Sequence, residues 1–263
     1  MIANLTNTAG NLALQLLRFV GGMTMLAREM WYSIWLRPFY PFLIIEQMYQ
    51  IGVRSLSLVA ATALSTGMVM ALQFGYGLQK FGGKLYVPKV VALSLIRELG
   101  PVFTSLMLAG RVGAGITAEI GSMNVTQQID AIRALGTSPI KKIVIPRVLA
   151  CLIVLPLLTV LANFIGVLGG MFIGMSELGI DAQFFYQKAA YTVTLTDFSV
   201  GIAKTFFFAG FISIVGCYFG MNTTGGTQGV GIATTKSVVT ASILIVISDF
   251  FLTKFFWILE RWL

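Results

Sequence analysis

Five long apolar segments dominate the pattern of hydrophobic and polar positions along the chain. A helix needs about 20 mostly apolar residues to cross a bilayer, whereas a barrel strand shows about ten residues of strict alternation. Because the apolar runs are continuous, they predict helices. The expected spans are residues 55–78, 89–109, 148–175, 198–219 and 237–258. The pattern therefore predicts an all-α integral membrane protein whose residues 55–263 form one five-helix domain.

The apolar segment at residues 11–36 differs from these five because two arginines and a glutamate interrupt it. Aromatic residues gather near its end, namely Trp31, Tyr32 and Trp35. A sixth span and a helix lying in the membrane interface both remain possible, and the charges with the aromatic cluster favour the interfacial helix. Pro38 and Pro41 then break the helix, so residues 1–54 are expected to form an interfacial helix and a linker.

The distribution of Lys and Arg predicts the orientation, because cytoplasmic loops are enriched in both. Basic residues concentrate in the N-terminal part and between the second and third spans, whereas the next loop has only Lys188. The first loop disagrees, since it carries Lys80, Lys84 and Lys89. We expect a cytoplasmic N-terminus and, with five spans, a C-terminus on the opposite side.

A short polar stretch, NVTQQIDAIRALGTSPIKKIVIPR, joins the second and third spans on the predicted cytoplasmic side. Asn124 is a possible N-cap, with Gln127 three positions later, and Gly136 with Pro139 should end the helix. Apolar residues form one stripe, Ile129, Ile132 and Leu135, and polar residues another, Gln128, Asp130 and Arg133. The stretch thus predicts an amphipathic helix at about residues 126–135, either a surface connector or a docking element for a soluble partner.

The preceding stretch, GRVGAGITAEIGSM (Gly110–Met123), is rich in small residues. If the second helix continues through it, two rows with a spacing of four lie side by side: Gly110, Ala114, Ala118 and Gly113, Thr117, Gly121. Such rows let helix backbones approach closely. We therefore expect tight helix packing rather than a ligand contact here.

Arg97 and Glu98 are adjacent charges midway along the second span, followed by Pro101. Charged groups inside a bilayer are costly and mark candidate functional sites. Pro101 has no N–H to donate, which frees the carbonyl of Arg97. The two charges could contact a lipid headgroup, which carries both signs, or each could pair with another helix and only hold the bundle together. Lys204 and Asp249 reach similar depths in the fourth and fifth spans, and we predict a buried, structural ion pair between them.

The amino-acid composition limits which classes of function the protein can have. The chain is 57% hydrophobic and 11% charged, against about 25% charged in soluble domains. Its net charge of +8 fits cytoplasmic loops and anionic headgroups rather than nucleic acid. Histidine is absent, and no metal motif or catalytic carboxylate pair is evident, which argues against a membrane enzyme. Cys151 and Cys217 are expected to be small core residues.

The chain has no G-x-x-x-x-G-K-[ST] loop, so it does not supply a nucleotide site of that type. The glycine-rich piece GGTQGVGIATTKS at residues 225–237 has the wrong spacing for phosphate binding. We expect it to be a turn before the fifth span.

Three stretches, LSLIRELGPV, AGRVGAGITAEIGSM and QQIDAIRALGTSPIKKIVIPRVLA, resemble the MlaE-type permeases of ABC transporters that work with MCE proteins. The resemblance is most specific from Leu93 to Pro156. Gln127 departs from the family pattern, which often has Glu there.

This resemblance implies a homodimeric, non-catalytic permease in the inner membrane of a Gram-negative bacterium. It would move phospholipids between that membrane and a periplasmic MCE ring, maintaining outer-membrane lipid asymmetry. A separate ATPase dimer would bind ATP and Mg²⁺, with a STAS-like subunit as a possible further partner. Residues 126–135 would be the coupling helix, with the ATPase-contacting residues Glu119, Gln128, Ile129, Asp130, Ile132 and Arg133. Position alone adds Met68, Leu72, Tyr76 and Leu78 to Arg97 and Glu98 as lipid-binding candidates. A sterol or fatty acid as substrate, or a non-transporting anchor of an MCE complex, remains an alternative.

Overall fold

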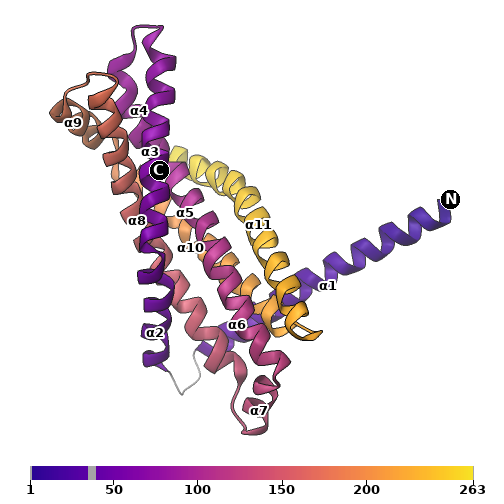
Figure 1. Cartoon of the computed structure of the whole chain (residues 1–263). Coiled ribbons are helices and arrows are strands. Elements are labelled where there is room, and N and C mark those ends of the chain that lie inside the picture. The colour runs from indigo at the N-terminus through magenta and orange to yellow at the C-terminus, as the bar shows by residue number, and fades with distance from the viewer. Residues whose placement is uncertain (1, 35–39, 263) are drawn as a thin grey trace.

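The computed structural model describes residues 2–34 and 40–262 (Figure 1). Five of its helices are long and apolar enough to cross a membrane: Pro41–Gln79, Lys84–Val125, Ile140–Ser176, Leu195–Met221 and Gly226–Trp262. Each contains one of the predicted spans, so the five-helix architecture is confirmed. Trp35 and Pro38 lie outside the described residues, while Pro41 begins the first long helix.

The α-helical elements are α1 (Ile2–Ile34), α2 (Pro41–Gly52), α3 (Leu56–Gln79), α4 (Val87–Ser94), α5 (Gly100–Leu108), α6 (Ala114–Val125), α7 (Gln128–Ala134), α8 (Ile145–Ser176), α9 (Ala182–Thr192), α10 (Leu195–Met221) and α11 (Gly226–Trp262). A 3₁₀ turn joins α2 to α3. Two π-helical turns, at Leu95–Leu99 and Ala109–Gly113, join α4, α5 and α6 into the second long helix. Each of the five long helices extends beyond the predicted apolar span at both ends.

One local prediction was wrong. The glycine-rich piece at residues 225–237 was expected to be a turn, but α11 begins at Gly226 and only the two positive-φ glycines, Gly225 and Gly226, make the turn. The segment after the third span contains a helix that the hydrophobic pattern did not predict, α9, whose N-cap Asp181 accepts a hydrogen bond from the backbone N–H of Phe184.

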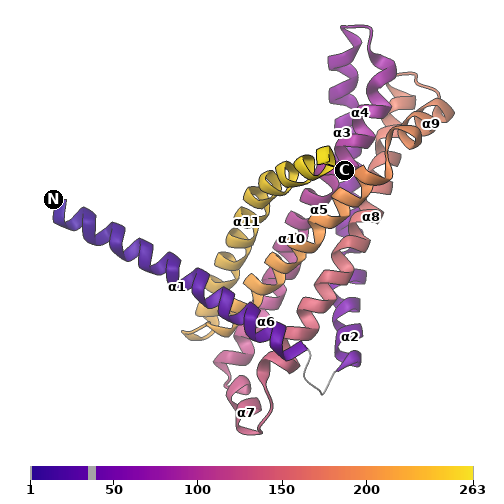
Figure 2. The same cartoon turned by 180° about the vertical axis from the view of Figure 1, so that it is seen from behind.

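Helices α8 and α10 form the centre of the bundle. In their most apolar windows 56% and 61% of residues are buried, against 22% in the α2–α3 helix and in α11. α1 leaves the bundle at a steep angle to the long helices, and α7 projects from the end near α1 (Figure 1). Seen from behind, α9 and the α3–α4 turn lie at the opposite end (Figure 2).

Only one of the two predicted rows of small residues packs within the chain. Thr117 is fully buried, and its hydroxyl donates to Gly216 O of α10 at 3.1 Å. Gly121 in the same row lies against Thr223. Gly110 in the other row is exposed and faces open space. Tight packing is therefore confirmed for the Gly113 row alone.

The closest helix contact involves Gly67 of α3 and leads to a prediction. A Cβ atom at Gly67 would lie 1.8 Å from Gly166 O of α8. Gly67→Ala should therefore force α3 away from α8 and lower stability by about 1–3 kcal/mol, the usual cost of overpacking. Gly77→Ala is the matched control in the same helix, because no other part of the described chain comes within 4 Å of its Cβ position beyond the adjacent helix backbone. Thermal unfolding of the purified variants measures both, and equal midpoints would contradict the close contact.

Candidate functional site

The π-helical turn Leu95–Leu99 positions the two charges of the second span. The N–H of Gly100 bonds to Leu95 O, five residues back, and Pro101 has no N–H to donate. Lys204 Nζ of α10 lies 3.5 Å from Arg97 O, the carbonyl that Pro101 was predicted to free. π-helical turns are rare and concentrate at functional sites, so this segment is a candidate for part of the functional site.

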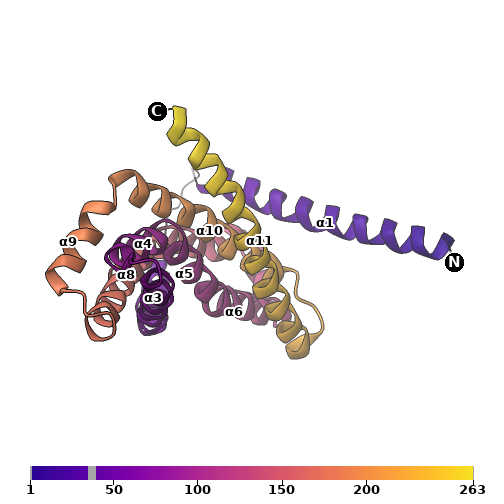
Figure 3. The same ribbon diagram turned by 90° about the horizontal axis from the view of Figure 1, so that it is seen from above.

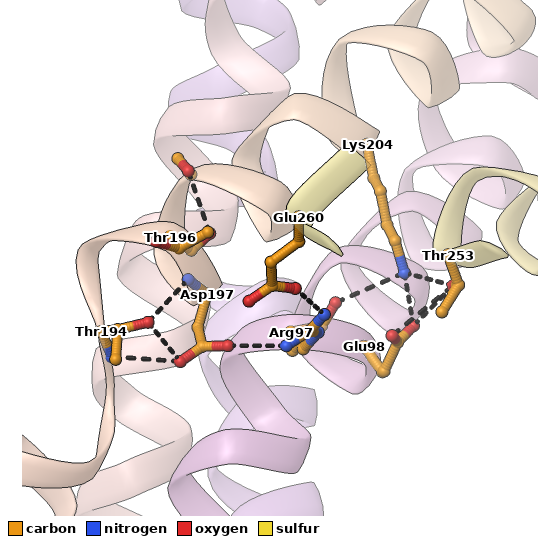
Figure 4. A network of polar contacts seen from close by, with 9 residues as sticks. Arg97, Glu98, Thr194, Thr196, Asp197, Lys204, Thr253 and Glu260 are labelled. Atoms are coloured by element: carbon orange, nitrogen blue, oxygen red, sulfur yellow. Dashed lines mark hydrogen bonds and ion pairs between the residues drawn. The ribbon is translucent and has the colours of Figure 1, made fainter. Parts of the chain in front are cut away.

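Arg97 joins the beginning of α10 to the end of α11 (Figure 4). Its Nη1 lies 2.8 Å from Asp197 Oδ1, and its Nη2 lies 2.7 Å from Glu260 Oε2. The second oxygen of Asp197 accepts hydrogen bonds from the N–H and hydroxyl of Thr194, which completes a capping box. Asp197 therefore stabilises the start of α10. The planar guanidinium therefore bridges carboxylates from two helices.

Lys204 is the centre of a second, adjacent set of contacts. Its side chain is fully buried, and its Nζ lies 3.0 Å from Asp249 Oδ1, the partner predicted from the sequence. The same Nζ also contacts the carboxylate of Glu98 and lies 2.7 Å from the Thr253 hydroxyl. The expected Lys204–Asp249 contact thus exists, but as part of a larger cluster.

Six charged side chains make up this cluster, defined as Arg97, Glu98, Asp197, Lys204, Asp249 and Glu260. Sequence reasoning missed the contribution of Glu260 and did not pair Asp197 with Arg97. One signal was available, because Asp249, Thr253 and Glu260 are spaced by four and seven residues and so share a helix face. Arg97 and Glu98 each pair with residues of other helices in the same chain. Their geometry within one chain therefore matches the alternative in which they hold the bundle together.

An open groove of about 550 Å³ lies beside the cluster along α11. Its lining residues are Arg97, Val246, Asp249, Phe250, Thr253, Lys254 and Trp257. The groove therefore combines cationic, anionic and aromatic side chains. None of the positional candidates Met68, Leu72, Tyr76 and Leu78 lines it, and Leu78 packs instead in a core cluster with α4 and α9.

The predicted coupling helix corresponds to α7, with three differences from the expectation. Asn124 lies inside α6 and its side chain donates to Thr223 O, so it does not cap α7; the N-cap is Gln127 in a left-handed conformation, φ 59°. Ile129 is only 1% exposed and Ile132 packs partly buried against the same core, so both anchor the helix instead of facing outward. Leu135 is 82% exposed and does not share that buried stripe.

The outward surface of α7 contains Gln128, Asp130 and Arg133, as predicted for the polar stripe. Asp130 and Arg133 form an exposed ion pair at 3.0 Å. Glu119 instead pairs with the buried Arg147 of α8 at 2.7 Å. The docking candidates are therefore the exposed polar residues of α7.

The chain matches known proteins over most of its length. The family model for the permease MlaE matches residues 44–255. A probable ABC transporter permease protein of Rickettsia felis is 41% identical over 97% of this chain and 99% of its own length. A probable ABC transporter permease protein of Synechocystis is 42% identical over 80% of both chains. The intermembrane phospholipid transport system permease protein MlaE of Haemophilus influenzae is 36% identical over 83% of this chain and 84% of its own.

Proposed function

Since the chain belongs to the MlaE family of ABC transporter permeases, we propose that it moves phospholipids across or out of the membrane and that the charged cluster with its groove contacts their headgroups. The observation that supports this proposal is the combination of both charge signs at one site within a membrane-spanning bundle. Charged groups within a bilayer are costly and usually face the bundle interior or a substrate path.

The accessibility of the cluster fits a zwitterionic headgroup. Glu98 and Glu260 keep 34% and 37% of their side-chain surface exposed, so their carboxylates remain within reach of an ammonium group. Arg97 lines the groove together with Lys254, and these two cations suit a phosphate. Phe250 and Trp257 supply apolar surface for the start of the acyl chains.

We further propose the assembly that this family resemblance implies. Two copies of the chain would associate, a cytoplasmic ATPase dimer would bind ATP and Mg²⁺ and dock on α7, and a periplasmic MCE ring would exchange lipid. A STAS-like subunit would act through the ATPase. In this arrangement the protein lies in a bacterial inner membrane with α1 and α7 on the cytoplasmic side, and it supports outer-membrane lipid asymmetry. The sparse burial of α3 and α11 leaves surface for the second copy.

Lipid analysis of two neighbouring phenylalanine variants tests the groove. Phe250 lines it, whereas Phe251 does not, although both are exposed residues of α11. The protein is co-expressed with its neighbouring genes and purified in mild detergent, and bound lipid is quantified by mass spectrometry. We expect Phe250→Ala to reduce bound phospholipid and transport about tenfold, or about 1.4 kcal/mol, close to the lower end of what an aromatic side chain contributes when a ligand covers it. Phe251→Ala should behave as the wild type.

The double variant Arg97→Ala, Glu98→Ala extends the test to the charges, with folded yield measured in parallel. Loss of phospholipid from the folded fraction supports the headgroup contact. Wild-type lipid content and transport in both the Phe250 and the double variants would refute it, and a complex that binds no lipid and no ATPase would refute the transporter proposal itself.

A further inference from the structure

A second cavity lies on the other side of the π-helical turn. It has a volume of about 290 Å³ and is lined almost entirely by apolar residues of α4, α8, α9 and the start of α10. Ile96 lines this cavity, while its neighbour Arg97 lines the groove beside α11. Seen along the bundle, α9 lies on the side away from α11 (Figure 3). The cavity, termed here the α8–α9 pocket, is therefore separate from the proposed headgroup site.

Asn163 is the one polar side chain of α8 that lines this pocket. It is 4% exposed, and neither its amide nitrogen nor its amide oxygen has a hydrogen-bond partner among the described residues. The oxygen lies against Gly100, where a Cβ atom would come within 1.8 Å of it. Buried polar groups in folded proteins are nearly always hydrogen-bonded. An unpaired buried amide therefore indicates a hydrogen-bond partner from outside the described residues.

The rest of the lining shows which chemistry could supply that partner. Among the residues that the structure describes, no charged side chain lines the α8–α9 pocket, so none of them would neutralise an ionic headgroup there. Phe164, Leu168 and Tyr186 line it and are also exposed, so the pocket reaches the outer surface of the bundle. A suitable occupant is thus an apolar chain that carries one uncharged hydrogen-bond acceptor.

We propose that the α8–α9 pocket binds an acyl chain of a membrane lipid, with the ester carbonyl of that chain accepting a hydrogen bond from Asn163 Nδ2. This site stands on the membrane-spanning fold alone and does not depend on the proposed transport. A chain bound here fills the space behind the charged cluster and supports the π-helical turn from the side of Ile96.

Lipids with and without ester carbonyls test the proposal. The purified protein is delipidated and titrated with a diester phosphatidylcholine or with the diether phosphatidylcholine of the same chain length, and native mass spectrometry counts the lipid retained. The wild type should bind the diester about fivefold more tightly, the factor expected for one net hydrogen bond. Asn163→Leu keeps the size of the side chain but has no donor, so the two lipids should bind it equally.

A second pair of variants tests the cavity without touching its buried wall. Ala190 lines the pocket from an exposed position of α9, and Gln187 is exposed on the same helix but lies outside the lining. Ala190→Trp should remove the ester-selective binding, and Gln187→Trp should keep it. Phe250→Ala should lower the total lipid retained, as expected for the groove beside α11, while the lipid that remains keeps the diester preference, which separates the two sites.

Equal binding of diester and diether lipids by the wild type would overturn the proposal. So would an ester preference that persists in Asn163→Leu, or equal lipid retention by the Ala190→Trp and Gln187→Trp variants.

Discussion

Replacing Lys204 by methionine is expected to remove most of the folded protein from the membrane. The ammonium group of Lys204 is fully buried and contacts two carboxylates, those of Glu98 and Asp249. Methionine fills similar volume but leaves both carboxylates without their cation. Breaking a buried ion pair in this way costs about 3–5 kcal/mol, which is a large part of the stability of an ordinary domain. Folded yield and the thermal midpoint, measured by size-exclusion chromatography in detergent, test the expectation.

Two further variants separate charge from packing. In the triple variant Lys204→Met, Glu98→Gln, Asp249→Asn no charge remains unpaired at this position, so a large part of the folded yield should return. Lys254→Met removes an exposed lysine of α11 and should leave the yield unchanged. If Lys204→Met folds as well as Lys254→Met, the cluster does not stabilise the bundle.

The hydrophobic pattern alone predicted the five spans, because apolar length is the physical requirement for crossing a bilayer. It did not predict α9, which is too short and too polar to produce a spanning signal. It also missed the start of α11, because the glycines of residues 225–237 indicated a turn. Gly229 and Gly231 are in fact helical, and a Cβ at Gly229 would lie 1.8 Å from Thr224 O, so close backbone approach accounts for that glycine.

The cluster was predictable only in part. Ionisable residues inside apolar spans stand out in the sequence, which identified Arg97, Glu98, Lys204 and Asp249. Their partners depend on how the helices are rotated, and the π-helical turn shifts the register of the second helix between Leu95 and Leu99. Glu260 lies beyond the predicted end of the fifth span, so it resembled an ordinary charge at the membrane boundary. The sequence correctly predicted the polar stripe of α7. That Ile129 points into the bundle could be seen only from how α7 packs against the core.

Reversing the charges of α7 is expected to detach the proposed ATPase while leaving the permease folded. Asp130 and Arg133 are exposed and pair with one another, so the double variant Asp130→Arg, Arg133→Asp retains an ion pair within the helix and inverts only the surface that α7 presents. Like charges across an interface cost several kcal/mol. Co-purification of the ATPase and lipid transport by the complex should therefore fall at least about 30-fold, the factor that corresponds to about 2 kcal/mol.

The folded yield of the permease provides the internal reference for this variant, since both side chains point away from the core that Ile129 anchors. Lys188→Asp is the matched control: it reverses an exposed charge on α9, at the opposite end of the bundle from α7 (Figure 2). That variant should retain the ATPase. Undiminished co-purification with the reversed α7 would mean that the ATPase docks elsewhere, and equal losses in both variants would mean that the loss is not specific to α7. We expect the ATPase to be lost from the α7 variant alone, because Ile129 anchors α7 to the bundle and leaves its charged side chains exposed for docking.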